Sequence, residues 1–198
     1  MSNMTRTPFS TLLVANRGEI AMRILRTAKA MGLRTVAVFS SADADAPHVL
    51  QADQAVHIGP AEPARSYLDI DAILAAARAS GGDAVHPGYG FLAEDAEVAR
   101  GCREAGLVFV GPSPDSIRAM GDKAAAKRLM QAAGVPCIPG YQGADQRAAT
   151  LLCEAEAIGW PVMIKAVAGG GGRGMRLVQD AAQFATLLQG AQSEALHA

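Results

Sequence analysis

The sequence predicts an α/β fold, a doubly wound parallel sheet followed by a smaller unit. Short β-branched runs alternate with helical patterns over residues 12–110, which is typical of a parallel sheet covered by helices. Three of the helical patterns stop at glycine, the residue that most readily ends a helix in a left-handed conformation. The right-handed crossover rule then removes most other topologies.

The first domain begins with a strand and a helix whose pattern is clear. Apolar residues recur at helical spacing from Ile20 to Met31, and the pattern stops at Gly32. Runs of apolar and β-branched residues bounded by turn signals indicate the strands. The expected strands of this domain cover 12–15, 35–39, 55–58, 84–86 and 108–110.

Two further helices complete the first domain. One has an apolar face over 70–77 and ends at Gly81-Gly82, and the next runs over 94–105 and ends at Gly106. The domain is expected to close near Gly111-Pro112, which assigns residues 1–112 to it.

Beyond residue 112 the pattern changes to short helices and turns. Residues 113–143 are predicted to form a helical connector, in which Pro136 and Pro139 mark a turn-rich stretch. Residues 144–198 then form a separate unit. The expected elements of these two parts are helices over 114–120, 123–133, 148–158 and 181–198, and strands over 162–164 and 175–178.

Composition excludes several classes of function. The 198 residues are 50% hydrophobic and 19% charged with a net charge of −1, so no basic surface for nucleic acid or a membrane is expected. Residues 1–10 lack a secretory signal, no apolar run is long enough to cross a bilayer, and a cytoplasmic protein is predicted. The unpaired spacing of Cys102, Cys137 and Cys153 argues against disulfides and a zinc site. All three are predicted to be small buried hydrophobic residues.

The most informative feature is a glycine run that follows an apolar strand. The strand ends on Lys165, and five glycines occur among residues 169–174. Glycine lets backbone N–H groups converge on an anion, so the run predicts a phosphate-binding loop, with a flexible linker as the alternative. The P-loop pattern is excluded because Met175 follows Gly174, and the dinucleotide fingerprint is excluded because the turn at 15–20 has a single glycine.

Four blocks of sequence together resemble biotin carboxylase, an ATP-grasp enzyme. They are Ala15-Asn16-Arg17-Gly18-Glu19-Ile20-Ala21, His86-Pro87-Gly88-Tyr89-Gly90-Phe91-Leu92, Met120-Gly121-Asp122-Lys123, and the Lys165 strand with its glycine run. Residues 140–146 and 163–165 look most like the biotin carboxylase (alpha) subunits of methylcrotonyl-CoA or geranyl-CoA carboxylases. The resemblance implies a Rossmann-like pre-ATP-grasp domain over 1–112 and an incomplete ATP-grasp lid over 144–198.

The resemblance also implies an activity and partners. The family is an ATP-dependent C–N ligase in which ATP and bicarbonate give carboxyphosphate, and the carboxylate is then transferred to biotin on a carrier domain. Mg²⁺ accompanies the ATP. The implied partners are the biotin carboxyl carrier domain and the carboxyltransferase subunit of an acyl-CoA carboxylase, with a homodimer as a further expectation.

The resemblance assigns nucleotide contacts by position. Lys123 and Lys165 match the two lysines that contact the nucleotide, and solvated surface lysines are the alternative. Arg173 is expected to add charge, and Met175 to face the adenine unless it is a core residue. The glycine loop expected to close over the phosphates is Gly169, Gly170, Gly171 and Gly172, with Gly171 and Gly172 as its direct donors.

The biotin pocket is assigned to the second block. Tyr89 and Gly90 are expected to face it, because ligands of open α/β sheets bind beyond the carboxyl ends of the strands. His86 is expected to be a structural residue without a role in proton transfer. Arg17 and Glu19 are expected only to brace the first turn.

The family's remaining functional residues are expected beyond the position that matches Ala198. These are its metal-holding acidic residues, its bicarbonate-binding arginine and its acid–base groups, so no catalytic and no metal-binding residue is assigned here. The 198-residue chain is therefore expected to be inactive and to bind ATP about 10³-fold more weakly, with mobile residues after about Gly134. Two alternatives stay open: another ATP-grasp ligase, which leaves the 86–92 block unexplained, and a non-catalytic nucleotide-binding or assembly module.

Overall fold

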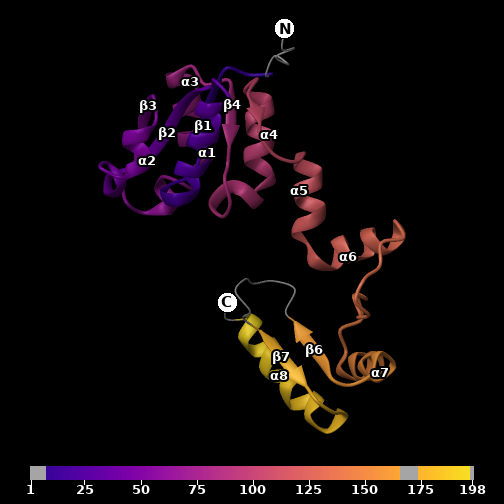
Figure 1. Cartoon of the computed structure of the whole chain (residues 1–198). Helices are drawn as coiled ribbons and strands as arrows, with labels where there is room; N and C mark the ends of the chain where they lie inside the picture. The colour runs from indigo at the N-terminus through magenta and orange to yellow at the C-terminus, as the bar shows by residue number, and fades with distance from the viewer. Residues whose placement is uncertain (1–7, 166–173, 197–198) are drawn as a thin grey trace. The chain divides into compact units, whose positions relative to one another are not determined.

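The computed structural model describes residues 8–165 and 174–196. Within the chain there are two compact units, Met1–Arg118 and Ala119–Ala198, which Figure 1 draws in indigo to magenta and in orange to yellow. Helix α5 (Pro114–Gly121) runs through the boundary.

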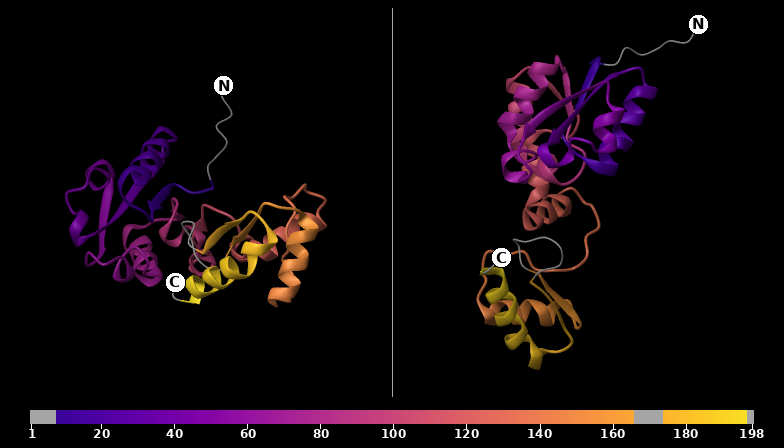
Figure 2. Two further views of the ribbon diagram at one scale, coloured as in Figure 1. Left: turned by 90° about the horizontal axis from the view of Figure 1, so that it is seen from below. Right: turned by 90° about the vertical axis from the view of Figure 1, so that its left-hand side faces the viewer.

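The first unit is a five-stranded parallel sheet with helices on both faces (Figures 1 and 2). The strand order is β3-β2-β1-β4-β5, and this confirms the predicted doubly wound α/β fold. The strands are β1 (Thr11–Val14), β2 (Arg34–Ser40), β3 (Gln54–Gly59), β4 (Ala84–His86) and β5 (Val108–Phe109), and the helices are α1 (Gly18–Ala30), α2 (Pro47–Gln51), α3 (Ile70–Ser80) and α4 (Ala96–Glu104).

Strand β1 is buried along its whole length because helices cover both faces of the sheet. Leu12 and Val14 lie in a cluster with residues of α1, whereas Leu13 and Ala15 lie in the larger cluster formed with α3 and α4. This alternation follows from the two-residue repeat of a strand. It explains why the sequence of β1 is a continuous apolar run rather than an alternating one.

Within the described residues, the sequence patterns located most elements but missed one α-helix and three short 3₁₀ helices. Strand 84–86 was predicted with the bounds that the structure has, and α3 ends at Gly81 with a left-handed φ of 68°. The five-residue helix α2 was not predicted, because it is too short to display a helical repeat. Asp69 and Asp95 begin α3 and α4 by accepting backbone N–H bonds from Ala72 and Glu97.

The strand order creates a switch point at the centre of the sheet. β1 pairs with β2 on one side and with β4 on the other, and the chain crosses from one half to the other between β3 and β4. The loops that leave the carboxyl ends of β1 and β4 therefore start side by side and then run toward opposite halves of the sheet. This is where open α/β sheets bind ligands.

The second unit is a hairpin packed on two helices. Strands β6 (Val162–Lys165) and β7 (Met175–Val178) are antiparallel, and they pack with α7 (Ala148–Ile158) and α8 (Ala181–Leu196). The core of the described part of this unit is small, with Ala155, Val178, Phe184 and Leu188 at its centre. Helix α6 (Lys123–Ala132) precedes the hairpin and α7.

The burial prediction for the cysteines holds for one of the three. Cys102 is buried in the core of the first unit, but Cys137 is partly exposed and Cys153 is exposed. Cys153 lies two positions from Ala155, the buried residue of α7, and two positions on a helix place side chains on opposite faces. Cys137 lies in the connector between α6 and α7, away from either core.

Truncating the core of the second unit should unfold that unit alone. In Phe184→Ala, a side chain that is 4% exposed is lost from a core with only a few buried residues, at a cost of about 3–5 kcal/mol. Hydrogen exchange read by mass spectrometry should then show loss of protection in β7 and α7, with β1 and β4 unchanged. Leu177→Ala, which removes a side chain that is 51% exposed, is the matched control. Protection of β7 equal to the wild type in Phe184→Ala would contradict this small-core account.

Candidate functional site

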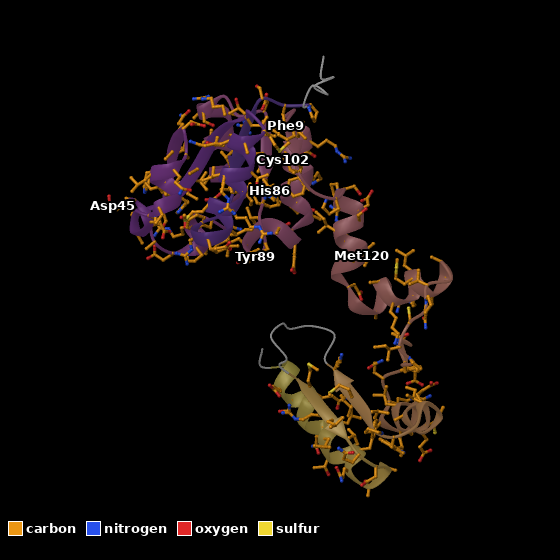
Figure 3. The ribbon with its side chains drawn as sticks, viewed as in Figure 1. Phe9, Asp45, His86, Tyr89, Cys102 and Met120 are labelled. Carbon is orange, nitrogen blue, oxygen red and sulfur yellow. The ribbon has the colours of Figure 1, made fainter. Side chains whose placement is uncertain are left out.

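The loop after β4 has an unusual backbone that presents Tyr89 to solvent. Gly88 and Gly90 have φ values of 69° and 65°, and Phe91 has a φ of 44° although it is not glycine. The Tyr89 side chain is 65% exposed and lies at the margin of the unit, whereas His86 lies deeper (Figure 3). The sequence thus places an aromatic ring and open glycine backbone at the switch point.

A buried amide ties this loop to the end of β1. Asn16 is 3% exposed, and its Nδ2 donates to the carbonyl oxygens of Pro87 at 2.8 Å and Tyr89 at 2.9 Å. Its Oδ1 accepts the backbone N–H of Arg17 at 2.9 Å. The sequence pattern indicates no role for Asn16, and its only signal is an asparagine two positions after a buried strand.

Arg17 joins two loops on the same edge of the sheet. Its guanidinium lies 5.6 Å from the ring centre of Tyr67 and 5.9 Å from that of Phe91, within the range of cation–π attraction. It also forms an ion pair of 3.3 Å with Asp43. Arg17 therefore does more than brace the first turn, because it connects the Phe91 loop to the segment after β2.

Hydrogen bonds hold the acidic partner of Arg17 in its charged form. Burial by itself raises the pKa of Asp43, but the bonds from Tyr67 and Ser40 and the charge of Arg17 outweigh it, and the net pKa lies below the ordinary value. The Tyr67 hydroxyl donates to Asp43 at 2.7 Å. Burial and then this bond raise the pKa of Tyr67 to about 12, so Tyr67 stays protonated.

His86 is placed as a structural residue. Its Nδ1 accepts the backbone N–H of Gly88 at 3.0 Å, which requires an unprotonated Nδ1. Burial lowers the pKa of His86. The neutral ring is thus engaged in shaping the loop, and the absence of a role for His86 in proton transfer stays a prediction.

The β6–β7 hairpin has one buried and one exposed face. Val162, Ile164 and Val178 pack in the core, while Met163 pairs with Leu177 and Lys165 pairs with Met175 on the other face. The exposed fractions are 43% for Met163, 37% for Met175 and 51% for Leu177. Met175 is thus not a core residue, and a lysine ends an exposed apolar surface. We call Met163, Lys165, Met175 and Leu177 the outer hairpin face.

Two residues of the outer hairpin face were missed from the sequence. Met163 and Leu177 follow from the two-residue repeat of a strand once Lys165 and Met175 are placed outward. Apolar residues occupy both faces of each strand, with Lys165 on one face and Arg176 on the other, so the sequence alone does not indicate which face is exposed. Met163 therefore belongs with the nucleotide-contact candidates for the same reason as Met175.

The other predicted contacts are only partly described. Lys123 is the first residue of α6, which begins with Asp122 accepting the backbone N–H groups of Ala124 and Ala125; the side chain of Lys123 is not described. Gly169, Gly170, Gly171, Gly172 and Arg173 lie outside the described residues. Their roles stay predictions.

The part of the chain that the structure describes contains neither a grouped metal site nor a membrane-spanning helix. There, no three His, Cys, Asp or Glu side chains are grouped so that they could hold a metal ion. In the same part of the chain, no helix is both long and apolar enough to span a membrane.

The chain thus consists of a doubly wound α/β domain, followed by a unit whose hairpin carries Lys165. Comparison with protein families identifies both parts: "Biotin carboxylase, N-terminal domain" matches residues 8–117, and "Carbamoyl-phosphate synthase L chain, ATP binding domain" matches residues 122–198. The chain belongs to the biotin carboxylase family.

Named relatives agree with this assignment. The chain is 54% identical over 184 residues to the alpha subunit of mitochondrial methylcrotonoyl-CoA carboxylase from Arabidopsis thaliana, covering 93% of this chain and 25% of that protein. It is 55% identical to the chloroplastic biotin carboxylase of the same plant, again over 93% of this chain, but 34% of the relative. The chain thus spans about a quarter to a third of the length of these curated relatives.

Solved structures agree as well. The biotin carboxylase of Campylobacter jejuni, solved as a β,γ-ATP complex, is 46% identical with a TM-score of 0.88, over 96% of this chain and 42% of that one. Together with the N-terminal family match, this favours biotin carboxylase over other ATP-grasp ligases.

The bond between Gly88 and His86 predicts a pH effect in the loop. Burial lowers the pKa of His86 below its ordinary value of 6.5, so the neutral ring contributes stability that is complete above about pH 6.5 and is lost as pH falls through the folded pKa. The amide resonance of Gly88 should therefore titrate with a midpoint below 6.5. Gly81, whose N–H donates to the Arg78 carbonyl, is the control. A Gly88 midpoint above 6.5 would contradict the assignment.

Proposed function

We propose that this chain supplies the N-terminal domain and the first part of the ATP-binding domain of a biotin carboxylase. The reaction is the ATP- and bicarbonate-dependent carboxylation of biotin on a carrier domain, for an acyl-CoA carboxylase. The observation that carries the proposal is the outer hairpin face, where Lys165 ends an apolar surface and stands four positions before Gly169, the first residue of the glycine-rich segment. ATP needs such a surface for its adenine and a cation for its phosphates.

The nucleotide contacts follow from the chemistry of the side chains. Lys165 is a compact, mobile cation at the end of a strand, suited to phosphate oxygens. Met163 and Met175 offer polarizable thioethers to an aromatic base. Lys123, Arg173 and the glycines 169–172 complete the proposed nucleotide site, with Gly171 and Gly172 as direct backbone donors to phosphate. Bound Mg²⁺ would offset phosphate charge.

The biotin contacts are proposed in the first unit. Tyr89 offers an exposed ring, and Gly90 offers backbone that no side chain covers, since a Cβ built there meets nothing within 4 Å. Both residues lie at the switch point of the sheet, where ligands of this fold bind. The proposed nucleotide contacts and the proposed biotin contacts lie in different units.

The remaining assignments concern partners and setting. We propose a biotin carboxyl carrier domain and a carboxyltransferase subunit as partners, with a homodimer as the assembly. The alpha-subunit assignment to methylcrotonyl-CoA or geranyl-CoA carboxylase remains a proposal, since the two Arabidopsis relatives are 54% and 55% identical. A cytoplasmic location is likewise a proposal. The two plant relatives, in contrast, are named as mitochondrial and chloroplastic proteins.

Methionine methyl NMR tests the nucleotide assignment on the 198-residue chain. With ¹³C-methyl methionine, ATP should shift Met163 and Met175 with a dissociation constant on the order of millimolar. Lys165→Gln should weaken that response. Met31, which is 57% exposed in the other unit, is the control. A response equal at Met31, or none at Met163 and Met175 at about tenfold the expected constant, would contradict the assignment.

A segment exchange tests the function itself. This chain would replace the matching 184 residues of the chloroplastic Arabidopsis biotin carboxylase, and the chimera should carboxylate biotin in the presence of ATP and bicarbonate. The chain alone should show no carboxylation. Lys165→Gln in the chimera should lower kcat/KM for ATP at least tenfold, because a cation on the transferring phosphates is lost. A folded chimera that binds ATP without carboxylating biotin would favour the non-catalytic module.

A further inference from the structure

The loop that presents Tyr89 cannot be held by its own backbone preferences. Gly88 and Gly90 have φ values of 69° and 65°, and Phe91 has a φ of 44°. Phe91 has a Cβ and resists this conformation, while glycine gains freedom in the unfolded chain. Contacts beyond the preferences of the backbone therefore help to impose the shape of the loop.

Asn16 makes the contacts that impose it. Its Nδ2 donates to the carbonyls of Pro87 and Tyr89, at 2.8 and 2.9 Å, and these carbonyls lie on either side of Gly88. The opposite amide orientation is excluded by chemistry: it would turn Oδ1 toward two carbonyl oxygens and Nδ2 toward the N–H of Arg17, which donates to Oδ1 at 2.9 Å. All three bonds require asparagine in this one orientation.

The fit between Asn16 and Gly88 leaves no spare room. A Cβ built on Gly88 would lie 2.7 Å from Nδ2, 3.0 Å from Cγ and 3.1 Å from Cβ of Asn16. Asn16 itself is only 3% exposed. The close approach therefore needs glycine at one position and asparagine at the other.

The next residue holds the other end of the loop. Arg17 lies over the rings of Phe91 and Tyr67, which stack on each other with centres 5.2 Å apart. Two consecutive residues after β1 thus hold the start and the end of the segment that contains Tyr89 and Gly90.

We propose that Asn16 is a positioning residue for biotin: by holding the Pro87 and Tyr89 carbonyls, it sets the direction in which the Tyr89 ring and the Gly90 backbone meet the substrate. The inference rests on the proposed function for its ligand. Asn16 itself touches no reacting atom. Asn16 acts on the substrate only through the position of the loop. The test therefore needs a signal from Tyr89 and a kinetic constant that is specific to biotin.

Fluorine NMR of the 198-residue chain labelled with 3-fluorotyrosine tests the positioning. The chain has three tyrosines, and Tyr141 belongs to the second unit, where it serves as a reference. Asn16→Asp keeps the acceptor for Arg17 and removes both donors, so the Tyr89 resonance should move toward its position in urea. Gly88→Ala, which drives a Cβ into Asn16, should have the same effect and covers the case that Asn16→Asp fails to fold.

Ser80→Ala is the matched control for lost stability. Ser80 is 5% exposed and, like Asn16, donates to two backbone carbonyls, those of Ala76 and Ala77, but it lies at the end of α3. Its variant should leave the Tyr89 resonance in place. A Tyr89 resonance that is unchanged in folded Asn16→Asp and folded Gly88→Ala overturns the proposal.

Kinetics in the chimera separate this proposal from the proposed function. Asn16→Asp should raise KM for biotin about tenfold or more, with KM for ATP unchanged, since the nucleotide contacts lie in the other unit. Ser80→Ala should change neither constant. A wild-type chimera without activity refutes the proposed function, whereas an active chimera in which Asn16→Asp leaves KM for biotin unchanged refutes the positioning role alone.

Discussion

The first unit depends on the burial of β1 between two layers of helices. Because β1 is central and covered on both faces, its carboxyl end opens directly at the switch point beside β4. Asn16 and Arg17, the second and third residues after the strand, are thereby delivered to the loop after β4. The hydrogen bonds of Asn16 and the ring contacts of Arg17 follow from that placement and fix the shape of the loop that carries Tyr89.

The second unit buries one face of its hairpin and leaves the other face exposed. A two-stranded sheet is marginal in water unless one face is buried, and α7 and α8 supply that burial through a small core. The other face stays exposed and apolar, with Lys165 at its end. An exposed apolar surface of this kind marks an interaction site, and the proposed nucleotide site would use it for the adenine.

The sequence alone predicts those bounds of helices and strands that depend on the pattern of neighbouring residues. The predicted bounds of α7 (148–158) and of β4 (84–86) agree with the structure, because apolar repeats and the glycines that end helices involve residues close together in the sequence. The bonds of Asn16 were not predictable, because Asn16 and Pro87 are 71 positions apart and no periodicity links them. Cys153 was misjudged because hydrophobic character does not tell which face of α7 meets the core.

The most direct test of the tie between the ends of β1 and β4 is a double-mutant cycle on Asn16→Ala and Gly88→Ala, measured as free energies of unfolding in urea. In Gly88→Ala the new Cβ meets the Asn16 side chain at 2.7 Å, and removing that side chain relieves the clash. The account predicts that the double variant loses less stability than the sum of the singles, by about 1 kcal/mol or more. Losses that add to within about 0.5 kcal/mol would contradict the coupling between these two residues.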